Sequence, residues 1–162
     1  YCGSTGWPTH AGVLEDGPIV RQDAARLERV HGPKARAAWR LSELTRPDDL
    51  DRFVLFSSAS AVLGAPGQSG YAAANACLDA LAAERRRQGR PATAIAWGPW
   101  SGAGMAAGRD ATEQGIGALE PERGLDVLDR ILDLGLDRAL PVLQLRTLRQ
   151  PWEPLGLGAG PA

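Results

Sequence analysis

The stretch that decides the fold is Phe53-Val-Leu-Phe-Ser-Ser-Ala-Ser-Ala-Val-Leu-Gly-Ala-Pro-Gly-Gln-Ser-Gly-Tyr71-Ala-Ala-Ala-Asn75-Ala. The continuous apolar run Phe53 to Phe56 does not alternate with polar residues, which is typical of a strand buried on both faces in the middle of a parallel sheet. A loop of small residues follows from Ala59 to Gly70. We then expect a helix from Tyr71 to about Gln88, whose inward face is formed by Ala74, Leu78, Leu81 and Ala82.

The same alternation of helix and strand continues on both sides of this unit. Upstream, apolar residues recur at spacings of three and four between about Val20 and Leu44, and Gly32-Pro33 interrupts them, which predicts two helical pieces or a kink. The inward stripe that we expect there consists of Leu27, Val30, Ala38, Leu41 and Leu44.

Downstream, Ala92 to Trp97 is typical of a second buried strand, and Ser101 to Gly117 is a glycine-rich segment that we expect to form a mobile loop. A helix beginning at Pro121 follows, and Leu140 to Leu145 predicts a last short strand. We expect the inward residues of that helix to be Leu125, Leu128 and Leu132. Together these patterns predict an α/β fold.

Composition excludes several classes of protein. With 162 residues and a formal net charge of −1, the chain is long enough for one domain and lacks the basic excess of most nucleic-acid-binding domains. No apolar run approaches the ~18 residues that span a membrane. Two cysteines without a spacing pattern favour a reduced, cytoplasmic setting, with Cys77 in the core, and two histidines are too few for a metal cluster. We expect Arg85, Arg86 and Arg87 to form a solvated helix end.

Three polar residues lie where an open parallel sheet binds its ligands. Ser58 ends the first strand, and Tyr71 and Asn75 project from one face of the following helix. A phenol has a pKa of about 10, and a nearby ammonium such as that of Lys34 would lower it. Lys34 lies on the expected inward stripe, so it either meets a partner or extends its amine to water. The alternative, a loop serine, a core tyrosine and a capping asparagine, stays open on spacing alone.

The segment Phe53 to Ala76 resembles the active-site segment of ketoreductase domains from modular polyketide synthases, which belong to the short-chain dehydrogenase/reductase superfamily. Further similarities occur in the same order, at Leu14-Glu15-Asp16, Pro33-Lys34 and Trp97-Gly-Pro-Trp100, and the resemblance runs from about His10 to Arg149. It implies the C-terminal half of a doubly wound, Rossmann-like parallel sheet. It also implies NADPH-dependent reduction of a β-ketoacyl thioester to a β-hydroxyacyl thioester.

By this resemblance Ser58 and Tyr71 bind and protonate the ketone oxygen, while Lys34 and Asn75 support the proton relay. A stand-alone short-chain dehydrogenase is a less favoured alternative, because that branch has lysine where Asn75 stands. The resemblance assigns the turn Gly98-Pro99 to the nicotinamide and Gly12 to the backbone beside the cofactor.

The resemblance also implies a stereochemical class. Leu14-Glu15-Asp16 resembles the Leu-Asp-Asp motif of B-type domains, which give the D-configured hydroxyl, although Glu15 replaces the aspartate. A-type domains have tryptophan five residues after the serine, where this chain has Leu63.

We divide the chain into an atypical start at residues 1–9, the C-terminal part of a ketoreductase domain at residues 10–150, and a linker or tail at residues 151–162. The implied partners are the missing N-terminal half of the domain, the other synthase domains and an acyl carrier protein whose phosphopantetheine carries the substrate. The alternative is a catalytically silent fragment of a larger synthase. We expect the chain by itself to be inactive.

Overall fold

The sheet is parallel and has three strands. The computed structural model describes residues 12–101, 117–136 and 138–139, the last pair by backbone alone. Strand β1 (Val54–Ser58) pairs with β2 (Thr93–Trp97), and β2 pairs with β3 (Arg138–Ala139), so the order is β1-β2-β3. The register places Ser58 opposite Trp97 at the carboxyl end of both strands.

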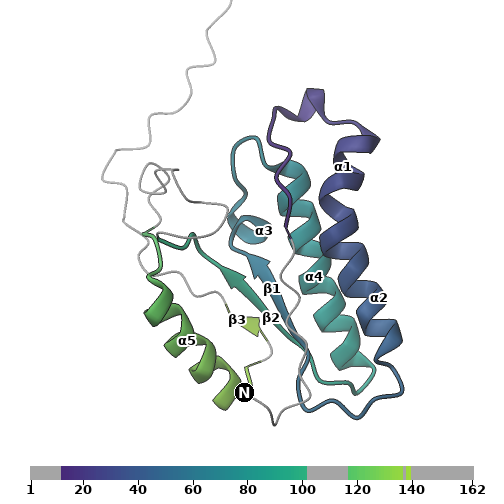
Figure 1. Cartoon of the computed structure of the whole chain (residues 1–162), viewed down its shortest axis with the longest axis vertical. Coiled ribbons are helices and arrows are strands. Elements are labelled where there is room, and N and C mark those ends of the chain that lie inside the picture. The colour runs from purple at the N-terminus through teal and green to yellow at the C-terminus, as the bar shows by residue number, and fades with distance from the viewer. Residues whose placement is uncertain (1–11, 102–116, 137, 140–162) are drawn as a thin grey trace, which may run out of the picture.

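Helices cover both faces of this sheet. On one face lie α4 (Ser69–Arg87) and, outside it, α1 (Ala24–His31) and α2 (Ala37–Leu44), and on the other face lies α5 (Pro121–Asp133) (Figure 1). The short helices are η1 (Ile19–Arg21), η2 (Gly32–Arg36) and α3 (Ser60–Leu63). The arrangement confirms the predicted α/β fold with a parallel sheet.

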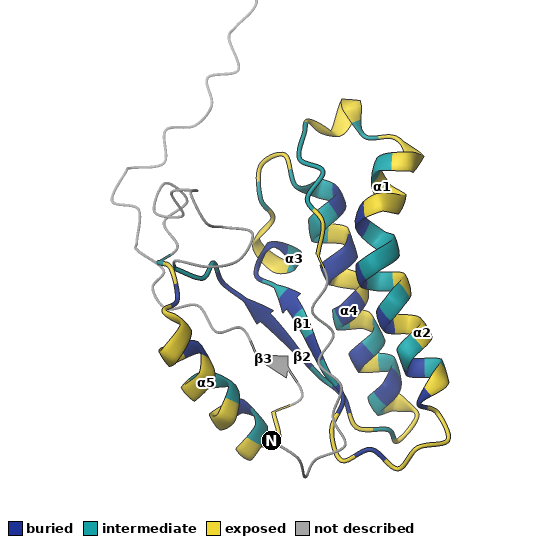
Figure 2. Cartoon of the chain, viewed as in Figure 1, coloured by how far each residue is buried: buried dark blue, intermediate teal, exposed yellow. Residues whose placement is uncertain are grey.

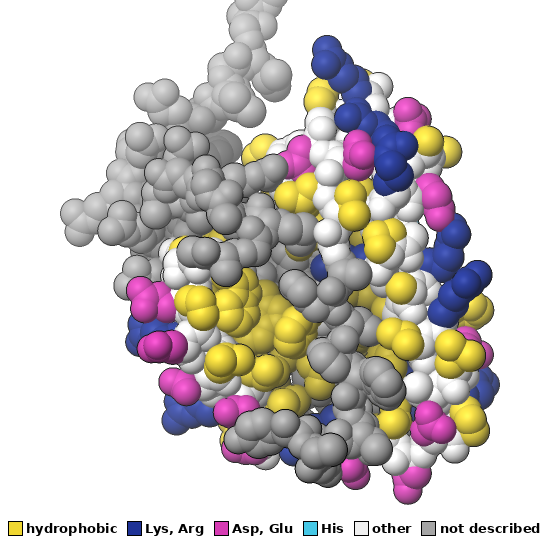
Figure 3. Space-filling model, viewed as in Figure 1, with side chains coloured by type: hydrophobic (Ala, Val, Ile, Leu, Met, Phe, Trp, Pro, Cys, Tyr) yellow, Lys and Arg dark blue, Asp and Glu magenta, His cyan; other side chains and the backbone are white. Residues whose placement is uncertain are grey.

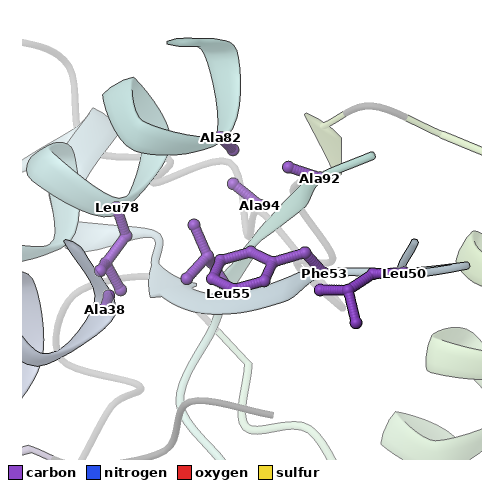
Figure 4. Close-up of a cluster of buried hydrophobic side chains, with 8 residues drawn as sticks. All are labelled: Ala38, Leu50, Phe53, Leu55, Leu78, Ala82, Ala92 and Ala94. Carbon is purple, nitrogen blue, oxygen red and sulfur yellow. The ribbon is translucent and has the colours of Figure 1, made fainter. Parts of the chain in front are cut away.

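Each face of β1 packs against its own apolar cluster. Phe53 and Leu55 are buried between the sheet and the α4 layer, where Figure 4 shows them together with Leu78 and Ala82. Val54 and Phe56 pack against the cluster on the α5 side, which contains Ile95, Trp97, Leu119 and Ile131. Full burial of an aliphatic or aromatic side chain of this size is worth about 1.5–3 kcal/mol. The continuous apolar run is therefore needed because both faces are covered.

The place of β1 in the sheet differs from the prediction of a middle strand. Among the described residues β1 pairs with β2 alone, so it stands at one end of the strand order. An apolar run indicates that both faces of a strand are covered by other elements, but it does not indicate which strands pair with its two edges. The predicted strand Leu140–Leu145, most of the loop Ser101–Gly117 and both terminal segments lie outside the described residues.

Several predicted inward residues are exposed. Leu125 is 60% exposed and Leu44 74% exposed, and Leu27 is exposed as well. In α5 the buried side consists instead of Gly124, with Val127 and Leu128 half-buried, and Ile131 (Figure 2). Leu125 lies about 100° around the helix from Gly124, because an α-helix has 3.6 residues per turn. The apolar face of α5 is thus narrower than its leucines suggest.

Two predictions for α4 are wrong for the same reason. The buried residues of α4 include Ala74, Leu78, Ala82 and Arg85, a stripe at spacings of three and four, so Cys77 lies beside the stripe and is exposed. Arg85 is 1% exposed rather than solvated. Its guanidinium lies 3.8 Å from the centre of the Phe53 ring and donates to Ser42 Oγ at 3.0 Å and to Pro91 O at 3.3 Å.

None of the helices in the described part of the chain is long and apolar enough to cross a membrane. The described residues also contain no group of three or more His, Cys, Asp and Glu side chains that could hold a metal ion.

Candidate functional site

The site lies where β1 ends and α4 begins. Tyr71 belongs to the first turn of α4 and is half-buried, and the amine of Lys34 lies over its ring, 5.1 Å from the centroid. Ser58 is the last residue of β1, and Asn75 lies one turn further along α4. The fold therefore brings together Lys34, Ser58, Tyr71 and Asn75, the four residues singled out in the sequence.

Lys34 comes from a π-helical turn between α1 and α2. Pro33 has no N–H to donate, and the N–H of Ala37 donates to Gly32 O, five residues back, in the wider π pattern. The chain stays helical through Gly32-Pro33 but changes pitch, which is the interruption that the sequence predicted. The turn directs Lys34 inward, where it is 9% exposed.

Burial governs the ionisation of Lys34. Loss of hydration lowers the pKa of its amine from 10.5 to about 8. Lys34 forms no ion pair with any described residue, so the ring of Tyr71 is the group that faces its charge. A buried amine of this kind favours an additional polar partner.

The pKa of the Tyr71 phenol is raised, because burial disfavours its anion. Interactions with the side chains of Asn75 and Ser58 act in the opposite direction and lower it. The prediction that Lys34 lowers this pKa is wrong for the described structure. The amine lies over the face of the ring, and the burial of the phenol outweighs the groups that favour phenolate.

Asn75 links the helix to the strand. It is fully buried, and its Nδ2 donates to the backbone oxygen of Tyr71 at 2.8 Å. Ser57 Oγ donates to the backbone oxygen of Asn75 at 3.2 Å, which ties α4 to β1. Asn75 Oδ1 is buried and has no hydrogen-bond partner among the residues described. A buried acceptor without a donor is uncommon in folded proteins and indicates a place for a ligand or water.

The hydroxyl proton of Ser58 is not used in its contacts with Ser60. Its Oγ accepts from the backbone N–H of Ser60 at 3.2 Å and from Ser60 Oγ at 3.0 Å. Both contacts use lone pairs of Ser58, so its own O–H can donate elsewhere. Ser60 was not identified from the sequence, although its position two residues after a strand end is typical of a residue that fixes a turn.

The segment Leu14–Asp16 is half-buried beside the turn that leads into α4. Gln68 Nε2 donates to both carboxylate oxygens of Asp16 at 3.3 Å, and Gly17 N donates to Gly67 O at 2.8 Å. Glu15 pairs with arginines of α1, at 2.7 Å to Arg29 and 3.2 Å to Arg26. These partners were not identified from the sequence.

The other site residues predicted from the sequence are Gly98, Pro99, Leu63 and Gly12. Gly98 is buried directly after β2, and Pro99 O accepts from Leu119 N at 2.7 Å. Leu63 is 49% exposed at the end of α3. Gly12 is exposed, and no hydrogen bond joins it to another described residue.

Comparison with known proteins identifies the family. The KR domain family matches residues 5–102. Spectinabilin polyketide synthase system protein NorB of Streptomyces orinoci is 52% identical over 137 residues, which is 80% of this chain and 6% of the relative. Polyketide synthase GfsE of Streptomyces halstedii is 46% identical over 156 residues, 90% of this chain and 4% of the relative.

Comparison with solved structures finds the same family. A solved structure of A-type ketoreductases from a modular polyketide synthase superposes with a TM-score of 0.82 at 44% identity, covering 86% of this chain and 30% of that one. The chain thus spans under a third of that structure and a few per cent of the curated synthases. It belongs to the KR, or ketoreductase, domain family of modular polyketide synthases.

Proposed function

We propose that this chain supplies the ketone-binding and proton-donating side of a reductase site. The reaction is reduction of a β-ketoacyl thioester, held on the phosphopantetheine of an acyl carrier protein, to the β-hydroxyacyl thioester. The observation that carries the proposal is the grouping of Lys34, Ser58, Tyr71 and Asn75 at the carboxyl end of β1. Ligands of open α/β sheets bind at this end of the strands.

The residues present fit the nicotinamide and ribose end of NADPH. The amine of Lys34 has no anionic partner among the described residues, and Asn75 Oδ1 is a buried acceptor without a donor. Ribose hydroxyls and a carboxamide offer both donors and acceptors to such groups. Lys34 and the Gly98-Pro99 turn would hold this end. When bound, NADPH supplies the hydride for the carbonyl carbon.

The side chains supply the proton and fix the oxygen. The O–H of Ser58 donates a hydrogen bond to the ketone oxygen, which stabilises negative charge as it develops there. The O–H of Tyr71 gives its proton to the same oxygen. A raised phenol pKa keeps that proton in place at neutral pH, and an alkoxide is a stronger base than a phenolate, so the transfer is favourable. The amine of Lys34 lies over the ring, 5.1 Å from its centroid, and we assign it to the proton relay rather than to a lowered phenol pKa.

The stereochemical class is also part of the proposal. Leu14, Glu15 and Asp16 lie against the turn before Tyr71, and Leu63 leaves the position of the A-type tryptophan without an indole. Both features support a B-type domain with a D-configured product.

The test uses the polypeptide that carries this chain, a β-ketoacyl thioester and NADPH or NADH. Tyr71→Phe removes one oxygen and retains the ring, and we expect kcat to fall by about a hundredfold or more, the usual contribution of a positioned acid. Cys77→Ala, at an exposed position of the same helix, is the matched control and should leave kcat unchanged. Equal rates for the parent and Tyr71→Phe would refute the role of the phenol, and an L-configured product would refute the B-type assignment.

For the 162-residue chain alone we propose that neither tight NADPH binding nor turnover occurs. Within the described ranges no glycine-rich turn joins a strand to a helix start that could hold a pyrophosphate. Calorimetric titration of the isolated chain with NADPH tests this, and a micromolar dissociation constant would contradict it.

A further inference from the structure

Glu15 is held by two arginines that project from the same side of α1. Arg29 Nε lies 2.7 Å from one carboxylate oxygen and Arg26 Nε lies 3.2 Å from the other. Arg26 and Arg29 are three residues apart, so their side chains are neighbours on the helix surface. The hydrogen bond from Arg29 is the largest of the effects that lower the pKa of Glu15. Glu15 is therefore ionised, and each of its carboxylate oxygens is paired with one arginine. We refer to these two ion pairs as the Glu15 grip.

The backbone around Glu15 is held by further hydrogen bonds. Gln22 Nε2 donates to Glu15 O at 3.3 Å, and Gly17 N donates to Gly67 O at 2.8 Å. Gly67 has φ +73°, a conformation that residues with a Cβ rarely adopt, so the turn is built around glycine. The segment therefore lies between α1 and the turn that leads into α4 (Figure 1). Figure 3 shows basic and acidic side chains together over this end of α1.

We propose that Arg26 and Arg29, acting through Glu15, are positioning residues that hold the segment Leu14–Gly17 against the turn at Gly67-Gln68 and thereby set which face of the ketone is reduced. Gly67 precedes Tyr71 by four residues, so the segment and the phenol share one support. A segment released from α1 would be free to move relative to the Gly67-Gln68 turn, and hence relative to Tyr71. The inference rests on the proposed reductase function.

The length of the glutamate side chain is essential to this grip. Aspartate is shorter by one methylene, which withdraws the carboxylate by about 1.5 Å, one carbon–carbon bond. Contacts of 2.7 and 3.2 Å would then exceed hydrogen-bond length on both arginines unless the backbone moved. Glu15→Asp therefore restores the Leu-Asp-Asp motif of B-type domains while it breaks the grip. Because Glu15→Asp keeps the negative charge and changes only where the carboxylate lies, this variant separates the effect of the charge from the effect of the ion-pair geometry.

The experiment compares the parent polypeptide with Glu15→Gln, Glu15→Asp and the double variant Arg26→Gln/Arg29→Gln. Glu28→Gln is the matched control, because Glu28 is also on α1 and pairs with Arg36, away from the segment. Two quantities are measured: hydrogen exchange of the peptide containing Leu14–Gly17, and the ratio of D- to L-hydroxy product. We expect exchange to become about fivefold faster and the ratio to fall about fivefold in all three grip variants, as for two partly exposed charge pairs. The control should match the parent.

The outcomes separate the two proposals. A parent that reduces no β-ketoacyl thioester would refute the reductase function, and the exchange rates alone would then decide whether the grip exists. Unchanged exchange in the double variant would overturn the grip. Faster exchange with an unchanged product ratio, or a Glu15→Asp variant that retains the parent ratio, would overturn its role in stereochemistry. Exchange of the peptide containing Thr93–Trp97 in the core serves to detect a variant that is unfolded.

Discussion

Replacing Lys34 by methionine should stabilise the fold. Burial lowers the pKa of Lys34 from 10.5 to about 8, and a pKa difference of one corresponds to about 1.4 kcal/mol, so keeping this amine charged at neutral pH costs about 3 kcal/mol. The Tyr71 ring, 5.1 Å from the amine, offsets about 1 kcal/mol of that cost. Methionine keeps most of the apolar stem and removes the charge. We therefore expect the free energy of unfolding to rise by about 2 kcal/mol at pH 7.

The advantage of the methionine variant should disappear as the pH rises. Between the folded pKa of about 8 and the unfolded value of 10.5, the unfolded chain binds more protons at Lys34 than the folded chain. The stability of the parent relative to Lys34→Met therefore rises with pH through this window and is level below it. At the upper end of the window the two proteins should differ by less than about 1 kcal/mol, because both then carry a neutral side chain.

The assay is urea unfolding at pH 7 and at pH 10, followed by tryptophan fluorescence, on the polypeptide that carries the chain. Arg40→Met, which replaces an exposed cation on α2, is the matched control and should change the free energy by less than about 0.5 kcal/mol at either pH. The reasoning fails if Lys34→Met is less stable than the parent at pH 7, or if the difference between them does not change with pH. Loss of reductase activity in the more stable variant would show that the charge serves function at the expense of stability.

Three further substitutions test the packing and backbone geometry of the fold. Gly124→Ala would place a Cβ 2.3 Å from the ring of Trp100, so unfolding should become easier by about 1–3 kcal/mol, whereas Leu125→Ala at the exposed neighbour should have little effect. Arg85→Ala removes the bonds to Ser42 and Pro91 and the contact with Phe53, and calorimetry should show a loss of about 3 kcal/mol or more, against less than about 0.5 kcal/mol for exposed Arg87→Ala. Gly67→Ala imposes a Cβ at φ +73°, so urea unfolding should reveal a cost of about 1–2 kcal/mol, and an unchanged midpoint would contradict the strained turn.

The elements of the fold could be predicted from local patterns. The apolar run from Phe53 and the small-residue helix after Tyr71 correspond to β1 and α4, and Gly32-Pro33 marks the π-helical turn. These features depend on periodicity and backbone chemistry within a few residues, which a sequence displays directly. The family resemblance also followed from ordered motifs along the chain, and the match to the KR domain confirms it.

Features that depend on contacts between elements distant in sequence could not be predicted from local patterns. The charge of Arg85 suggested a solvated end of α4, but Phe53 and Ser42, from other parts of the chain, surround it. The sign of the pKa shift of Tyr71 depends on how deeply α4 is covered, and the burial of the phenol outweighs its polar neighbours.

The sequence by itself placed Ser58 at a strand end and Tyr71 and Asn75 on one face of the following helix, and so identified them as candidate site residues. Only the tertiary structure decided what surrounds them. Lys34 reaches Tyr71 because a π-helical turn redirects it, and Glu15 meets Arg26 and Arg29 because the extended segment folds back along α1. Spacing along a chain specifies the direction of a side chain from its own element, whereas burial and charge partners arise from elements that are distant in sequence.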